Sequence, residues 1–159
     1  MSHLKRTTRI NAPLEQVYAT AHDPIHWSDW YVGISNEKNL EVAASGQTRI
    51  LIVGTPFPLT QRVLEDRLRG TEAHWRAEPE GKSKTIDVRD SCKMLMISGE
   101  QDWSYSSKNG ETEVRVVLDF VVPSELLERA EDRNLIERME AECLEQSLEN
   151  LRLLCETTH

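Results

Sequence analysis

The chain has 159 residues, 38% of them hydrophobic and 29% charged, and a formal net charge of −8 at pH 7. This composition indicates one soluble globular domain, spanning 1–159, that is long enough to bury roughly two-thirds of its unfolded surface. The negative charge argues against nucleic acid and anionic membranes as partners, because both repel an acidic protein. No apolar run approaches the length of a membrane span, and we expect neither a signal peptide nor membrane insertion.

The cysteines predict reduced thiols rather than a disulfide framework. The three cysteines are Cys92, Cys143 and Cys155. Cys143 and Cys155 fall on one expected helix roughly 18 Å apart, which is too far for a disulfide. Free thiols are typical of the cytoplasm, so we expect a cytoplasmic protein.

The N-terminal segment predicts a strand followed by two short helices. Residues 4–10, LKRTTRI, are rich in β-branched side chains and indicate an opening strand. In 11–21, NAPLEQVYATA, apolar residues change to helical spacing after Pro13, which a helix tolerates at its first position. Asp23 and Pro24 repeat this start signal, so a second short helix follows.

From residue 34 to residue 123 the pattern changes to strands separated by turns. Asn109 and Gly110 mark a hairpin turn. In the strand that follows, apolar residues from Val114 to Phe120 share one face, which is typical of an antiparallel sheet with one solvated face. The expected strands are 39–42, 48–53, 59–68, 72–79, 93–107 and 112–122.

Residues 124–156 predict one long amphipathic helix. They contain neither glycine nor proline, and apolar side chains repeat at helical spacing from Ile136 to Cys155. The polar segment near Asp132 is compatible with a continuous helix and with a bend or break at this point. Because an antiparallel sheet with one apolar face must be covered, we expect this helix to lie across it.

The order of these elements and three of its segments resemble the helix-grip superfamily of START/Bet v 1-like (SRPBCC) proteins, and within it the polyketide cyclase/dehydrase family. The segments are INAPLEQVYATAHDPIHWSDW (10–30), DWSYSSKNGETEVRVVLDF (102–120) and the leucine-rich last helix. The resemblance implies an α+β fold in which a curved antiparallel sheet of about seven strands wraps around a long C-terminal α-helix. Two short helices between the first two strands are implied to close one end of an elongated cavity.

The cavity implied by this resemblance predicts binding of a small hydrophobic, aromatic or lipid-like molecule. Trp27, Trp30 and Tyr31 are implied at its mouth. Trp27 and Trp30, three residues apart, also suit plain packing against the sheet, and periodicity leaves open whether the interior is filled or hollow. Phe57 is either a gate or a buried plug. The candidate ligand-binding residues are Trp27, Trp30, Tyr31, Phe57, Trp75, Trp103, Leu118, Phe120, Met139 and Cys143.

An alternative function is that of a polyketide aromatase/cyclase or dehydratase, and whether the protein is an enzyme stays open. In such relatives the cavity folds the substrate and a few side chains move protons. The catalytic candidates are Tyr31, Arg62, Asp66 and Tyr105, with His74 considered last. A third interpretation is a protein-interaction module that uses the charged face of the last helix.

Residues 59–68 form the most ambiguous strand, because charged side chains occupy both of its faces. If its even positions point inward, Arg62 and Asp66 enter the cavity together and can polarise a carbonyl or an enol. If the strand faces solvent, both are ordinary surface charges.

No metal or cofactor site is expected. His22 and His26 lie near Asp23 and Asp29, but Pro24 breaks the helix that would bring both imidazoles together, so we interpret both as exposed histidines. The sequence contains no Cys-x-x-Cys, His-Glu-x-x-His, phosphate-loop or dinucleotide-binding motif. The expected partner is a small hydrophobic molecule, and a homodimer stays open.

Overall fold

The structure is a computed structural model that describes residues 2–23, 26–32, 40–42, 48–52, 59–80, 99–121 and 131–157. The strands in this part of the chain are β1 (Ser2–Ile10), β2 (Leu40–Val42), β3 (Thr48–Ile52), β4 (Leu59–Arg69), β5 (Glu72–Glu80), β6 (Gly99–Lys108) and β7 (Glu111–Phe120). The helices are α1 (Leu14–His22), α2 (Trp27–Trp30) and α3 (Asp132–Thr157). Phe57, Cys92 and residues 93–98 of the expected strand 93–107 lie outside the described residues.

The strands form one antiparallel sheet in the order β1-β7-β6-β5-β4-β3-β2. The first strand of the chain pairs with the last, so that Ser2 lies opposite Phe120 and Ile10 opposite Thr112. The β6–β7 hairpin turns at Asn109 and Gly110, whose φ angles of 53° and 81° are the left-handed conformations that an Asn-Gly turn requires. The predicted antiparallel sheet and its closing hairpin turn are thus confirmed.

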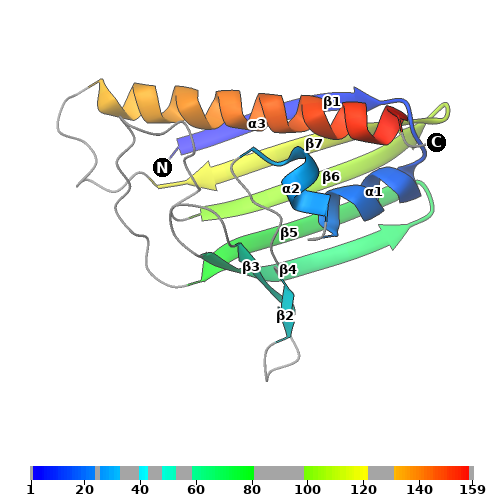
Figure 1. Cartoon of the computed structure of the whole chain (residues 1–159), viewed down its shortest axis with the longest axis horizontal. Helices are drawn as coiled ribbons and strands as arrows, with labels where there is room; N and C mark the ends of the chain where they lie inside the picture. Colours follow the sequence, from blue (N-terminus) through cyan, green and yellow to red (C-terminus); the bar gives the residue numbers. More distant parts are fainter. Residues whose placement is uncertain are drawn as a thin grey trace.

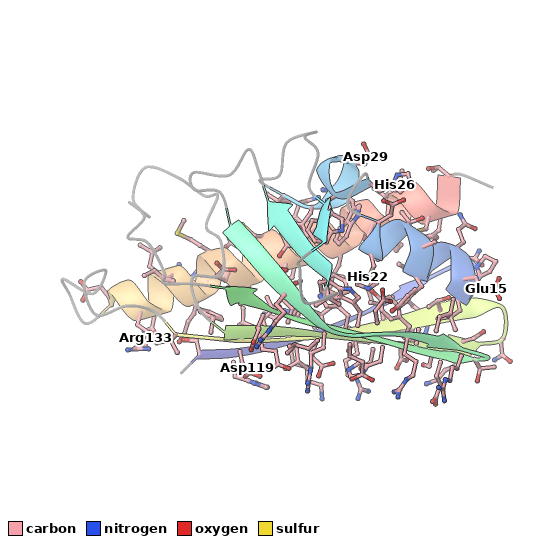
Figure 2. All side chains as sticks on the ribbon, turned by 90° about the horizontal axis from the view of Figure 1, so that it is seen from below. Glu15, His22, His26, Asp29, Asp119 and Arg133 are labelled. Carbon is pink, nitrogen blue, oxygen red and sulfur yellow. The ribbon has the colours of Figure 1, made fainter. Side chains whose placement is uncertain are left out.

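The described helices lie on one face of the sheet, which we call the inner face (Figure 1). α3 packs along β1, and α1 lies beside it over β5, β6 and β7. Seen along its edge, the sheet separates these helices from the outer face, where Asp119 lies (Figure 2). The predicted α+β fold, with a long C-terminal helix against the sheet, is confirmed.

The hydrophobic core lies between α3 and the inner face of the sheet. Along β7 the even-numbered side chains are buried on this face, and α3 directs its apolar stripe toward them. Burial of each leucine-sized side chain contributes roughly 1.5–3 kcal/mol to stability. The buried residues of these two elements that form the core are Val114, Val116, Leu118, Phe120, Ile136, Leu144, Leu148, Leu151 and Cys155.

A β-bulge in β4 explains why its sequence alternates poorly. The register to β5 shifts between Val63 and Glu65, so the residues on either side of Leu64 alternate in different phases. Directly opposed residues of an antiparallel pair share a face. Asp66 lies opposite the buried Trp75 and is therefore on the inner face.

Arg62 lies on the other side of the bulge and on the other face. It is opposite Glu78 and forms an ion pair with that carboxylate. Its neighbour Val63 lies opposite the buried Ala77, which places the odd positions before the bulge on the inner face. The interpretation in which Arg62 and Asp66 enter the interior together is therefore wrong, because the extra residue reverses the alternation between them.

Candidate functional site

His22 lies among aromatic rings between α1 and the sheet (Figure 2). Its imidazole stacks on Trp75, with ring centroids 4.4 Å apart and an interplanar angle of 18°. The rings of Tyr18, Tyr105 and Trp103 surround it at centroid distances of 4.9, 5.3 and 5.7 Å. We call these five residues the aromatic cluster. The expectation that His22 is exposed is wrong, because His22 is the last residue of α1 and faces the sheet.

The imidazole of His22 is neutral at pH 7, because burial lowers its pKa well below the ordinary value. Its Nε2 atom is hydrogen-bonded to the hydroxyl of Tyr105. Burial, followed by the nearby Tyr18, raises the pKa of Tyr105, so the phenol stays protonated and its O–H can donate to Nε2 when that nitrogen carries no hydrogen. A neutral imidazole held in this way can act as a general base.

Tyr18 connects the aromatic cluster to β4. Its hydroxyl donates to the carboxylate of Asp66 and lies 3.1 Å from the backbone carbonyl oxygen of His74. Burial and this carboxylate raise the pKa of Tyr18. Asp66 itself is exposed, so the pair lies at the solvent border of the inner face. The structure therefore brings Asp66 and Tyr105 to one region, since the rings of Tyr18 and Tyr105 are 5.2 Å apart.

The two tryptophans of α2 have different surroundings. Trp27 donates its indole N–H to the carbonyl oxygen of Ala21 at 3.0 Å. Trp30 lies next to Tyr31 and Trp103, with ring centroids 5.3 and 5.8 Å away. The buried N–H of Trp30 has no hydrogen-bond partner in the part of the chain that the structure describes. Trp27 thus has the surroundings of a core residue, whereas Trp30 presents an unused donor to the interior.

Glu140 is a buried carboxyl that the sequence interpretation missed. It is 5% exposed, and its Oε1 atom has no hydrogen-bond partner among the described residues. Burial raises its pKa to about 8, so the carboxyl is protonated at pH 7. The pKa of Tyr31 is raised by burial and then by Glu140, which indicates that the two groups are neighbours. The sequence does contain a signal, because Glu140 is four residues from both Ile136 and Leu144 on the apolar stripe.

Two buried glutamines bring further polar groups onto the inner face. Gln61 of β4 and Gln101 of β6 are 2% and 6% exposed. Trp103 donates its indole N–H to Gln101 Oε1 at 3.1 Å, and Gln101 Nε2 donates to Gln61 Oε1 at 3.3 Å. These bonds connect β6 to β4 across β5 and orient the Trp103 ring. The interior is therefore an aromatic surface with a few placed polar groups.

The other sequence-predicted residues are distributed over the same interior. Leu118 and Phe120 are buried on β7, and Met139 and Cys143 are half-buried on α3. Arg62, by contrast, lies on the outer face and is not brought together with the other catalytic candidates.

The histidine pair considered from the sequence is divided by the fold. His22 belongs to the aromatic cluster, whereas His26 lies 3.4 Å from Asp29 at the start of α2. Among the described residues, no group of three or more His, Cys, Asp or Glu side chains is arranged to hold a metal ion. None of the described helices combines the length and hydropathy that a membrane span needs.

The sequence matches the model of the family described as polyketide cyclase / dehydrase and lipid transport over residues 1–156. The chain belongs to this family. The match includes the aromatic cluster and Glu140, and it confirms the family resemblance of the opening and closing segments. No curated protein matches this member of the polyketide cyclase / dehydrase and lipid transport family.

Solved structures similar to this family member support the fold. A START superfamily protein from Mycobacterium smegmatis has a TM-score of 0.69 and 16% identity, with 99% of each chain covered. The Zhui aromatase/cyclase from Streptomyces sp. R1128 has a TM-score of 0.62 and 13% identity, and the alignment covers 98% of this chain and 93% of the Zhui chain. The Aha1 dimer from Colwellia psychrerythraea has a TM-score of 0.58 and 12% identity, and the alignment covers 99% of this chain and 98% of the Aha1 chain. At these identities the likeness shows a shared fold.

Proposed function

We propose that the protein binds a small hydrophobic or aromatic, lipid-like molecule between the inner face of the sheet and its helices. One observation supports this most: the interior contains two buried polar atoms, Trp30 Nε1 and Glu140 Oε1, without a hydrogen-bond partner in the described chain. An unpaired buried polar group costs about 1–3 kcal/mol, and native proteins pair nearly all such groups. A ligand that supplies the missing partners removes this cost.

The two groups define the chemistry of the ligand. Trp30 offers an N–H donor, and Glu140, with its pKa raised to about 8, offers a protonated carboxyl that can donate as well. Both suit an acceptor such as a ketone oxygen, and neither supplies a charge at pH 7. The aromatic rings beside them, including Trp103, contribute apolar contact area. We therefore infer a neutral, largely aromatic ligand that carries at least one carbonyl or hydroxyl oxygen.

A matched pair of probes tests this proposal. 2-Acetylnaphthalene and 2-ethylnaphthalene have nearly the same shape, but only the ketone has an acceptor oxygen. We expect calorimetric titration to show the ketone binding about 5–10-fold more tightly, since one hydrogen bond contributes about 1 kcal/mol. Trp30→Phe and Glu140→Leu should each reduce this preference.

Trp27→Phe is the control, because it removes an indole N–H that is already bonded to Ala21. It should lower stability and leave the preference for the ketone intact. Equal affinities for the two probes, or no binding of either by the folded protein, would contradict the proposal.

A second candidate function is that of a polyketide aromatase/cyclase or dehydratase. The observation that favours it is the neutral His22 hydrogen-bonded to Tyr105, with Asp66 and Tyr18 nearby. Ring closure of a poly-β-ketone requires proton transfer between carbon and oxygen, for which a neutral imidazole and a phenol are suited. In this reading Tyr31, Asp66 and Tyr105 remain catalytic candidates and His22 joins them. Turnover separates the two functions, because a binding protein returns the same molecule that it took up.

A further inference from the structure

The outer face of the sheet contains an open depression of about 590 Å³ at the end where the β4–β5 and β6–β7 hairpins turn. It is on the opposite face of the sheet from the aromatic cluster, so it is a separate site. The residues that matter for its chemistry are Arg67, Arg69, His74, Ser104, Lys108 and Arg115. This volume is within the range of small-molecule sites, which span about 300–1,000 Å³.

The strand register places four of these side chains in one row across the depression. Arg67 of β4 lies opposite His74 of β5, His74 lies opposite Ser104 of β6, and Ser104 lies opposite Arg115 of β7. Neighbouring strands are about 4.8 Å apart, so the two arginines start about 14 Å apart and flank the exposed Ser104 hydroxyl. The row contains two permanent cations and a hydroxyl, and no carboxylate.

The third member of this row, His74, is held by two carboxylates. Its Nε2 atom is 2.5 Å from Asp102 and its Nδ1 atom 3.0 Å from Glu65. Burial lowers the pKa of His74, but the hydrogen bonds that its ring donates to these two carboxylates outweigh this effect, and the pKa is raised. The two acids therefore hold the His74 ring in place and favour its protonated form, and Glu65 also pairs with Arg67 at 3.3 Å.

The charges around the depression do not balance locally. Two carboxylates line it, and one of them, Glu113, lies between Lys108 and Arg115 at 3.5 and 4.0 Å. The other, Glu72, lies opposite Arg69 in the strand register, without an ion pair between them among the described residues. Arg67 is paired with Glu65, which does not line the depression. An excess of cations gathered at one concavity is unexpected for a protein whose net charge is −8. Oxyanions are the ligands that guanidinium groups bind best, through paired N–H donors.

We propose that this outer-face depression binds a small phosphorylated molecule, with phosphoryl oxygens held by Arg67, Arg115 and the Ser104 hydroxyl. The concave shape favours a small molecule over a membrane, since a lipid surface needs no hollow. Arg69 and Lys108 lie at the margin and attract the anion electrostatically. The proposal is independent of the ligand inside the fold, because the two sites lie on opposite faces of the sheet.

Calorimetric titration of the full chain with ADP and with inorganic pyrophosphate tests this site, with adenosine as the uncharged comparison. We expect both anions to bind competitively, adenosine not to bind, and the affinity to fall at least 5-fold between low and high salt. Arg67→Gln and Arg115→Gln should each weaken ADP binding about 10-fold, as charge-assisted hydrogen bonds are lost. Circular dichroism and melting temperature confirm that each variant is folded.

Lys5→Gln provides the matched control, because it removes one exposed positive charge from the outer face of β1, outside the depression. It should leave ADP binding unchanged. An equal loss in this control would show that binding follows overall charge, and would overturn the proposal. The proposal would also be overturned if neither ADP nor pyrophosphate bound. It would be overturned as well if the protein sedimented with phosphatidylserine vesicles but did not bind ADP.

Discussion

Glu140 is an acidic residue at a buried position of α3, where an apolar side chain would be expected. The sequence surrounds it with charged residues, but α3 directs it into the apolar stripe between Ile136 and Leu144. An ionised carboxylate without partners would be too costly there, so the group keeps its proton, and burial raises its pKa to about 8. The same protonated carboxyl is what suits it to a neutral ligand.

This residue predicts a specific dependence of stability on pH. The folded-state pKa of Glu140, about 8, is above its unfolded value, so the folded protein binds more protons between pH 4.5 and pH 8. Its contribution to stability is therefore fully present below pH 4.5 and is lost as the pH rises through 8. We expect Glu140→Gln, measured by urea unfolding, to be more stable than wild type by about 3 kcal/mol at pH 8.5, with the difference shrinking toward pH 5.

Glu142→Gln is the matched control, because Glu142 is an exposed carboxylate on the same helix. Its free energy of unfolding should stay within about 0.5 kcal/mol of wild type at both pH values. A Glu140→Gln curve that runs parallel to that of wild type would show that this carboxyl is ionised in the folded protein.

At the scale of elements, the irregular points of the strands decide which residues face inward. The bulge in β4 places Asp66 on the inner face, at its solvent border, and Arg62 on the outer face. Gly99 begins β6 with a φ of 140°, where its Cα lies against the backbone of β7. A Cβ atom at this position would lie 1.7 Å from the carbonyl oxygen of Asp119, so the sheet can form there only with glycine.

Gly99→Ala should therefore destabilise the protein strongly, by about 3 kcal/mol or more, because the strand pairing must open to admit a methyl group. Gly70→Ala is the comparison. Gly70 also has a positive φ, 56°, but its missing Cβ would meet nothing within 4 Å. It should cost about 1 kcal/mol, the ordinary penalty for a left-handed alanine. Similar melting temperatures for the two variants would show that β6 and β7 can separate at this point without loss.

For the whole molecule, the two faces of the sheet carry different kinds of side chain. The inner face packs aromatic and aliphatic side chains against α1 and α3. The outer face carries ion-paired charges, and more cations than carboxylates line its depression at the hairpin end. α3 covers the inner face and packs on β1, α1 and α2. Stability of the whole fold should therefore depend on the buried side of this helix.

Leu151→Ala tests this dependence, because Leu151 is 0% exposed between α3 and the sheet. We expect a loss of about 3 kcal/mol in the free energy of unfolding, from lost burial and the cavity that remains. Leu153→Ala, two residues further along the same helix and 48% exposed, should change it by less than about 0.5 kcal/mol. If both variants unfold at the same urea concentration, the proposed docking of α3 is wrong.

The sequence by itself determined the order of the elements, the closing Asn109–Gly110 hairpin and the long helix that covers an antiparallel sheet. These features follow from periodicity and turn chemistry, which act over a few residues. Only the tertiary structure decided which polar groups lie on the inner face of the sheet or the buried side of α3. His22, Glu140 and Asp66 are directed inward by the end of a helix, the phase of an apolar stripe and a bulge. The effect of each depends on residues far away in the chain, which local spacing does not reveal.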